Sequence, residues 1–489
     1  MNRLPSPLVV TLTAAIATSS TFADEDRISP EDFVVHPQVA GTLNVIDAWI
    51  DGIRDYEKVP GISAGIVYDD TLIWSEGYGF SNLESERPAD AETIYSICSI
   101  SKLFTSIGIM QQRDAGRLRL SDRVSEHLDW FDIEEDHQEY GPPTIEGLLT
   151  HSSGLPRESW GAYWNAPDFP FPTREEMIRQ LSEQQTLYPA HSIFQYSNLA
   201  LTLAGEIVQE TSGTDYQEYI QSQILDPLKL EDTRTYYPED MRGQQLAIGY
   251  TGLDRRGIRE PVNPFFTRAI TPAAGFTSTV NDLGRFAIWQ FATLDGEEND
   301  ILERNTLREM QRVHWVDPDF DTTWGLGFSS RKIDGDTAVG HGGGCPGYIT
   351  QFVLMPRYRI ATIVLTNAGD GPANNTAVNM IKQMRTAVRT AKRPFRGETP
   401  DYSAYEGNYA GPPWGGETAV RQKGDRLILL DLPSYDLKAA QTKLKHVEGD
   451  VFVRLTDDNE EREQWVFTMG ENSKASKVLR HGFEMYRLD

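Results

Sequence analysis

The sequence contains few cysteines and, after its first residues, no long apolar run. A membrane-spanning helix needs ~20 mostly apolar residues, and no segment beyond the N-terminus approaches that length. We therefore expect no insertion into a membrane. The two cysteines, Cys98 and Cys345, could pair in an oxidising compartment or remain separate thiols, and their number alone leaves both alternatives open.

Positively charged residues are also scarce. The 46 Lys and Arg residues are outnumbered by 72 Asp and Glu residues, which gives a formal net charge of -26 at pH 7. A surface this acidic repels nucleic acid and anionic lipid. We expect neither of them as a partner.

Motifs for metals and phosphate cofactors are absent as well. The nine histidines are scattered, and none lies at a zinc-ligand spacing from another histidine or a cysteine. No glycine-rich loop is followed by the Lys-Ser/Thr pair of a phosphate-binding motif. We therefore expect the protein to need no metal and no other cofactor.

The first residues have the pattern of a secretory signal. Arg3 provides the positive start, Leu8 to Ala17 form a short apolar stretch, and Thr21-Phe-Ala23 is a small-residue cleavage site. The pattern predicts a signal peptide over residues 1–23 that is cut after Ala23. The mature protein should then be periplasmic or secreted.

The 489 residues are 39% hydrophobic and 24% charged, as in a folded protein, and their number predicts two or three structural units. Strand patterns lie at both ends of the first unit, with helical patterns between them, so we expect one sheet built from both ends. The predicted elements are a hairpin over 61–82, helices over 144–149, 174–183 and 199–210, a second hairpin with strands 351–355 and 360–365, and a helix over 375–390.

The pattern changes around residues 392–400, and short strands separated by polar turns follow. This spacing is typical of a small antiparallel barrel or sandwich. We therefore place the first domain at residues 24–395 and a C-terminal β domain at 396–489. The strands are expected at 427–430, 451–454, 464–467 and 483–486.

Ser99 lies three residues before Lys102, at the start of an apolar-periodic stretch. On the first turn of a helix this spacing puts the hydroxyl and the amine on one face. A serine hydroxyl becomes a good nucleophile when a base takes its proton, and the positive end of a helix dipole favours a neutral, proton-accepting lysine. By itself the pair is a weak signal, because the same spacing recurs by chance.

Two later motifs make the pair far more specific. Tyr196-Ser-Asn198 precedes a predicted helix, and His341-Gly-Gly-Gly-Cys345 precedes the second hairpin. In this order and at these distances, Ser-x-x-Lys, Tyr-x-Asn and a His-x-Gly version of Lys-Thr-Gly resemble the serine β-lactamase and penicillin-binding-protein superfamily. The similarity is to the branch of class C β-lactamases, D-specific peptidases and related esterases, and it covers residues 45–390.

The resemblance implies an α+β fold with a β-lactamase-like antiparallel sheet, flanking helices and a mostly helical subdomain. The segment Tyr405-Glu-Gly-Asn-Tyr409 resembles the lipocalin-like barrels that some members append. The C-terminal domain should then be a small antiparallel barrel.

The resemblance also implies a role for each motif residue. Ser99 would attack a carbonyl and form an acyl-enzyme, and Lys102 and Tyr196 would form a proton relay in which Tyr196 acts as a phenolate-like base. That role requires the site to lower the tyrosine pKa from about 10. Asn198 would orient the substrate amide, and the backbone N–H groups of Ser99 and Gly344 would form the oxyanion hole.

The two cysteines flank these motifs. Cys98 and Cys345 occupy the places of the active-site disulfide in certain carbapenem-hydrolysing class A β-lactamases, which are distant relatives. That resemblance predicts a Cys98–Cys345 bond. Such a bond would tie the segment of the nucleophile to the strand of the oxyanion hole.

The substrate-binding strand departs from the β-lactamase pattern. His341 and Gly342 replace the lysine and threonine that bind a substrate carboxylate, while Gly343 and Gly344 complete the strand. An imidazole is mostly uncharged at neutral pH, so we expect slow or absent β-lactam hydrolysis. His-Gly-Gly resembles D-specific aminopeptidases and several esterases instead.

The sequence therefore predicts a serine hydrolase that acts on amide bonds of small peptides or cell-wall-like fragments, with a small molecule or short peptide as substrate. A carboxylesterase, a weak β-lactamase and a catalytically inactive penicillin-binding-like protein are the alternatives. Acyl transfer and hydrolysis share the acyl-enzyme and are not separated by sequence. The oligomeric state is not predicted.

Overall fold

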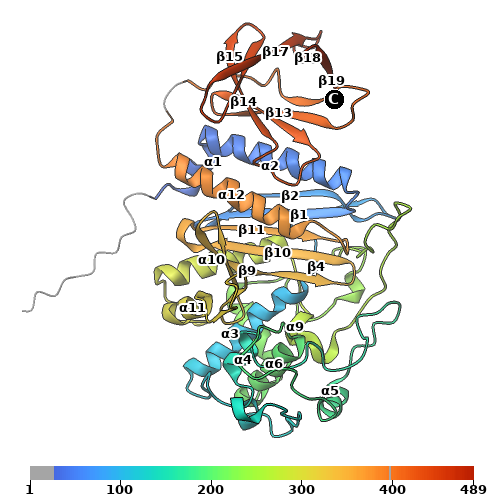
Figure 1. Cartoon of the computed structure of the whole chain (residues 1–489), viewed down its shortest axis with the longest axis vertical. Coiled ribbons are helices and arrows are strands. Elements are labelled where there is room, and N and C mark those ends of the chain that lie inside the picture. Colours follow the sequence, from blue (N-terminus) through green and yellow to red (C-terminus); the bar gives the residue numbers. More distant parts are fainter. Residues whose placement is uncertain (1–26, 396–397, 489) are drawn as a thin grey trace, which may run out of the picture.

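The computed structural model describes residues 27–395 and 398–488, so the predicted signal peptide and its cleavage site lie outside the described residues. The chain up to Ala391 is organised around one antiparallel sheet (Figure 1). Its nine strands, from edge to edge, are β3 (Arg87–Pro88), β2 (Thr71–Asn82), β1 (Gly61–Tyr68), β11 (Ile360–Thr366), β10 (Tyr348–Met355), β9 (Asp336–Cys345), β8 (Ser329–Ile333), β7 (Thr323–Trp324) and β6 (Trp315–Val316).

The two ends of this unit meet in the middle of the sheet. β1 pairs with β11 from Ile62↔Thr366 to Tyr68↔Ile360. Both strands are buried along their whole length, which explains their nearly continuous apolar sequences. The predicted hairpins β1–β2 and β10–β11, and the sheet built from both ends, are confirmed.

Helices cover both faces of the sheet. On one face α12 (Ala373–Ala391) packs on β10 and β11, and α2 (Pro37–Tyr56) packs on α12 and β2, with α1 (Pro30–Val35) beside it. On the other face α10 (Val280–Asp295) packs on β1, β2 and β11. Below α10 lies the mostly helical part (Figure 1). Its helices include α3 (Ser101–Asp114), α4 (Ile145–Leu149), α5 (Arg174–Leu181), α6 (Asn198–Ser212), α9 (Thr271–Ala274) and α11 (Arg304–Gln311).

Three of the predicted helices, α4, α5 and α6, begin at hydroxyl-bearing caps. Ser197 accepts the N–H of Ala200 at the start of α6, which ends at Gly213 with φ 70°, a left-handed conformation that glycine adopts without strain. Thr173 forms a capping box with Glu176 at the start of α5. Among the described residues, no helix combines the length and the apolarity that crossing a bilayer requires.

The C-terminal strands form a closed antiparallel barrel, because β12 pairs with both β13 and β19. Aromatic side chains that include Tyr409, Phe452, Trp465 and Phe467 fill its interior. The predicted α+β fold with a C-terminal barrel is confirmed. The barrel strands are β12 (Gly407–Ala410), β13 (Glu417–Lys423), β14 (Arg426–Leu432), β15 (Gln441–Glu448), β16 (Val451–Leu455), β17 (Glu461–Met469), β18 (Ala475–Arg480) and β19 (Phe483–Arg487).

Helix α2, which the sequence analysis did not identify, lies between the sheet and the barrel (Figure 1). Trp49 is fully buried in a cluster that also contains Ile428 and Leu430 of β14, and its indole N–H donates to the Ser434 carbonyl at 2.8 Å. The helix approaches β13 most closely at Gly41, where a Cβ would lie 2.4 Å from the Lys423 Cα. A small residue is therefore required there.

We expect Gly41→Ala to lower the free energy of unfolding by about 1–3 kcal/mol, because its methyl group would meet backbone atoms of β13. Gly284→Ala in α10 is the matched control, since its Cβ would lie 3.5 Å from the nearest side chain. That change should be neutral, or stabilising by up to about 1 kcal/mol through helix propensity. Calorimetric melting would measure both. Equal melting temperatures for the two variants would contradict the close contact.

Candidate active site

Ser99 lies in a short 3-10 turn, Cys98–Ile100, immediately before α3. It remains partly exposed, whereas Cys98 and Ile100 are fully buried. This position differs from the first turn of the helix, which the spacing to Lys102 predicts. The side chains of Ser99 and Lys102 nevertheless lie as close together as the spacing predicts, with 3.0 Å between the Lys102 Nζ and the Ser99 Oγ.

Lys102 is fully buried. Its Nζ also lies 2.8 Å from the Asn198 Oδ1 and 2.8 Å from the Ala273 carbonyl oxygen. All three oxygen partners are uncharged, and burial holds the pKa of Lys102 well below its ordinary value near 10.5. The site therefore favours the neutral amine, which can accept a proton from Ser99.

Tyr196 faces the same pair. Its ring centroid lies 4.9 Å from the Lys102 Nζ and 5.0 Å from the Arg157 guanidinium carbon. Burial raises the pKa of Tyr196, although its hydrogen bond with Ser99 acts in the opposite direction. The expected phenolate is thus not favoured in the free protein, since it would be a buried anion. Lys102, not Tyr196, has the lowered pKa.

The Asn198 amide connects Lys102 to a carboxylate that the sequence analysis missed. While its oxygen faces Lys102, its Nδ2 donates to the Glu158 Oε1 at 2.7 Å. Glu158 also accepts a hydrogen bond from the Tyr163 hydroxyl, and its Oε1 lies 3.3 Å from the Arg157 Nε. Glu158 therefore fixes which end of the amide points at Lys102. Its only sequence signal was its position directly after the Gly154-Leu-Pro-Arg157 loop.

The glycine-rich part of β9 runs beside the turn that carries Ser99. A Cβ on Gly343 would lie 2.2 Å from the Ile97 carbonyl oxygen, so only glycine allows this approach. Gly344 pairs with Ile349 on β10. The predicted Cys98–Cys345 disulfide is present and joins the two segments, with 5.7 Å between the Cα atoms. It holds Cys98 at φ 51°, a conformation that costs a non-glycine residue about 1–2 kcal/mol.

His341 lies on β9 and is only 3% exposed. Its Nδ1 is 2.5 Å from the Gly342 carbonyl oxygen, and its Nε2 has no hydrogen-bond partner among the described residues. Burial is the main cause that lowers the pKa of His341 to about 3, and Lys102 acts in the same direction whenever it is protonated. The imidazole is therefore neutral at physiological pH, as the sequence analysis expected.

His151 positions the loop that carries Tyr196. Its Nδ1 accepts the Ser197 N–H at 3.2 Å, its carbonyl accepts the Gln195 N–H at 2.7 Å, and its ring centroid lies 4.3 Å from that of Tyr196. These contacts give His151 a structural role beside the site. Among residues 27–395 and 398–488, no group of three or more His, Cys, Asp or Glu side chains is arranged to hold a metal ion.

Comparisons with known proteins identify the family and its relatives. The beta-lactamase family profile matches residues 46–383. A D-aminopeptidase of Cereibacter sphaeroides is 26% identical over 337 residues, which are 66% of this chain and 60% of that protein. The D-alanyl-D-alanine-carboxypeptidase/endopeptidase AmpH of Escherichia coli is 25% identical over 352 residues, which are 68% of this chain and 85% of AmpH. The chain thus spans less than two thirds of the D-aminopeptidase.

A solved structure extends the similarity to nearly the whole chain. The octameric penicillin-binding protein homologue from Pyrococcus abyssi has a TM-score of 0.63 and 25% identity to this chain, and the match covers 91% of this chain and 100% of that one. The shared architecture therefore includes most of the described residues, beyond the segment that the family profile matches.

We expect Gly343→Ala to lower the melting temperature clearly, because its methyl group would push β9 away from the Ile97 carbonyl, at a cost of about 1–3 kcal/mol. Gly344→Ala is the control, since its Cβ would have only the Ile349 Cδ1 within 4 Å, at 3.4 Å. Its melting temperature should stay close to that of the wild type. If Gly343→Ala melted like the control, the close approach of β9 to the nucleophile turn would be wrong.

Proposed function

Since the chain belongs to the beta-lactamase family, we propose that it is an exported serine hydrolase that cleaves amide bonds of small peptides or cell-wall-like fragments through an acyl-enzyme. The observation that carries this proposal is the partly exposed Ser99 hydroxyl, 3.0 Å from a buried lysine with a lowered pKa. A nucleophile and its base at hydrogen-bond distance are what covalent catalysis requires.

The proposed first step transfers one proton and forms one bond. The Ser99 Oγ attacks the substrate carbonyl carbon while its proton passes to the neutral Lys102 amine. The backbone N–H groups of Ser99 and Gly344 stabilise the oxyanion that forms. Tyr196, hydrogen-bonded to Ser99, gives its hydroxyl proton to the leaving amine and regains one from the Lys102 ammonium. Water then attacks the ester and releases the acid.

The state of His341 favours amides and esters over β-lactams as substrates. A neutral imidazole with a pKa of about 3 is a weak partner for the carboxylate that a cationic lysine would bind. The D-aminopeptidase and AmpH relatives support a peptidase of D-residues. Rates on D- and L-aminoacyl anilides, short esters and nitrocefin would rank these classes.

We also propose a signal peptide over residues 1–23, a hydrolase domain at residues 24–395 and a C-terminal barrel domain at residues 396–489.

Replacing the nucleophile and the proposed proton donor should have different effects. Ser99→Ala should reduce turnover to the background rate and abolish covalent labelling by a serine-directed phosphonate, because the attacking oxygen is gone. Tyr196→Phe should slow turnover by ~10²–10⁴-fold, the usual contribution of general acid–base catalysis. Ser192→Ala, an exposed serine in the same loop, is the control. Phosphonate labelling of Ser99→Ala at the wild-type rate would refute the assignment.

The pH profile of kcat/KM should identify Lys102 as the base. Activity should rise with pH as Lys102 loses its proton, since only the neutral amine accepts the Ser99 proton. The Glu158 carboxylate raises the pKa of Lys102 and the Arg157 guanidinium lowers it. Glu158→Gln should therefore shift the rising limb to lower pH, and Arg157→Gln should shift it to higher pH. Shifts in the same direction would exclude Lys102 as the titrating group.

A further inference from the structure

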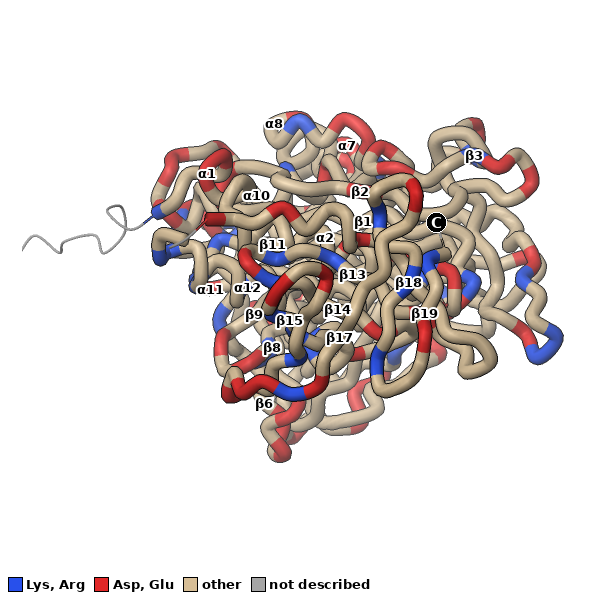
Figure 2. Tube along the Cα trace, turned by 90° about the horizontal axis from the view of Figure 1, so that it is seen from above, with Lys and Arg blue, Asp and Glu red and all other residues tan. Residues whose placement is uncertain are grey.

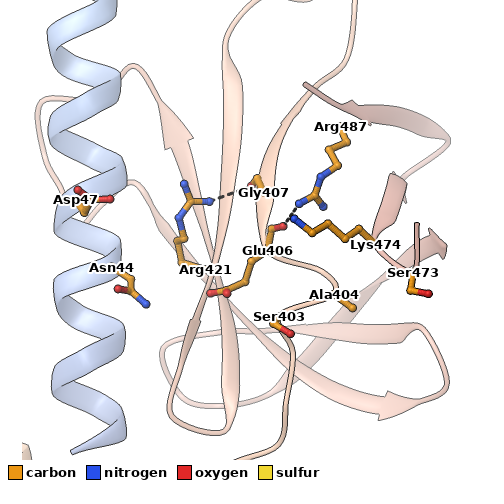
Figure 3. Close-up of a pocket in the computed structure, with 10 residues that line it drawn as sticks. All are labelled: Asn44, Asp47, Ser403, Ala404, Glu406, Gly407, Arg421, Ser473, Lys474 and Arg487. Carbon is orange, nitrogen blue, oxygen red and sulfur yellow. Dashed lines mark hydrogen bonds between the residues drawn. The ribbon is translucent and has the colours of Figure 1, made fainter. Parts of the chain in front are cut away.

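Two cavities lie where the barrel meets the helices that cover the sheet. The larger, of about 640 Å³, lies between α2 and the β12 end of the barrel (Figure 3). Its charges are mixed: the carboxylates of Asp47 and Glu406 line it together with Arg421, Lys474 and Arg487. The Arg421 guanidinium donates to backbone carbonyls, including that of Gly407 at 3.1 Å. These contacts account for its polar lining without a ligand.

The second cavity, of about 370 Å³, has a different charge pattern. It lies where the start of α2 and the end of α12 meet strands β13 to β15 of the barrel. Among the described residues that line it, Asp425 provides the only carboxylate. The cationic side chains in its lining are those of Arg393, Lys423, Arg426 and Lys443. The site therefore has an excess of positive charge at neutral pH.

Two of these cations, Lys423 and Lys443, lie on the strands either side of β14, on the outer surface of the barrel. Ile428 on β14 pairs directly with Lys443 on β15, and Lys423 on β13 lies diagonally across from Ile428 because it pairs with Arg426. Among the described residues, neither lysine ammonium has a hydrogen bond or an ion pair with a carboxylate. Burial and the charge of Lys443 lower the pKa of Lys423 to about 8.

This cluster of cationic side chains contrasts with the negative net charge of the whole chain. The chain has a net charge of -26, and acidic segments lie at many of its loops and helix ends, including those near α1, α7 (Tyr216–Ile220) and β3 (Figure 2). Like charges that share a partly buried site destabilise the fold unless an anion neutralises them. The lysine pair is therefore better explained by a bound anion than by solvent exposure.

The apolar side chains of the cavity set a second requirement for the ligand. Pro394, Phe395 and Ile428 give the cavity an apolar wall, and the Phe395 ring lies edge-on to His36 with 6.1 Å between the centroids. An apolar wall next to convergent polar groups is typical of a site for a small organic ligand, and the volume is in the usual range. Inorganic anions would leave the apolar wall without a partner.

We propose that this cavity binds an organic phosphate, with the phosphoryl group between Lys423 and Lys443 and an apolar substituent against Phe395 and Ile428. A phosphate monoester has nearly two negative charges at neutral pH and three acceptor oxygens, which suit several cations better than one carboxylate does. Arg426 already donates to the Asn459 Oδ1 at 3.3 Å and lies 3.8 Å from the Asp425 carboxylate, so the two lysines are the main cations for the phosphoryl group. The proposal is independent of the chemistry at Ser99.

Isothermal titration of the full-length protein with phenyl phosphate tests the site. We expect saturable binding that weakens about tenfold or more in Lys423→Met and in Lys443→Met, while Lys443→Arg retains it. Lys445→Met is the matched control, because Lys445 is two residues further along β15 and its Nζ pairs with Glu461 at 2.8 Å outside the cavity. Its affinity should equal that of the wild type. No binding, or equal binding by wild type and both Lys→Met variants, would overturn the proposal.

Further titrations define the ligand. Inorganic phosphate should bind at least about tenfold more weakly than phenyl phosphate, because it buries no apolar surface, and phenylacetate should also bind more weakly. If either bound as tightly as phenyl phosphate, the assignment of an organic phosphate would be wrong. Phosphatidylcholine vesicles with and without phosphatidic acid separate the two sources: lysine-dependent binding to the acidic vesicles indicates a lipid phosphate, and its absence alongside phenyl phosphate binding indicates a soluble one.

Discussion

The candidate site depends on the burial of the Lys102 amine beside Ser99. An ammonium without a carboxylate partner is costly inside a protein, and the three acceptors around this nitrogen, from the Ser99 turn, α6 and α9, are all uncharged. Burial therefore favours the neutral amine, which is the form that a proton acceptor needs. The packing of α3 against α6 and α9 is thus part of the chemistry as well as of the fold.

The second constraint is the close approach of β9 to the nucleophile turn. β9 reaches that turn because the sheet is assembled from both ends of the unit, with β1 beside β11. Gly343 allows backbone contact with Ile97, and the Cys98–Cys345 disulfide fixes the two segments together. The proposed oxyanion site, formed by two backbone N–H groups from distant parts of the chain, would need this rigidity, because it cannot be adjusted by side-chain rotation.

Helix α2 links the sheet to the barrel, and the two ends of this contact have different chemistry. At its centre, Trp49 and residues of β14 form an apolar cluster. Toward its start, the barrel presents Lys423 and Lys443 to a cavity with a single carboxylate. The barrel surface that packs on α2 therefore changes from apolar to cationic within a few residues of β13, β14 and β15. This change in charge separates the proposed ligand cavity from the apolar packing interface beside it.

The sequence determined the motif residues and the local elements. Ser99, Lys102, Tyr196, Asn198 and the glycines after His341 were selected from their motifs. Periodicity and turn residues predicted both hairpins, four of the helices and four of the eight barrel strands, but not α10. Helix α2 was missed because it is buried against two partners. Glu158, the pKa directions of Lys102 and Tyr196, and the Lys423–Lys443 pair emerged only from the tertiary structure. Each depends on burial and on distances between residues far apart in the chain, which spacing along a sequence does not encode.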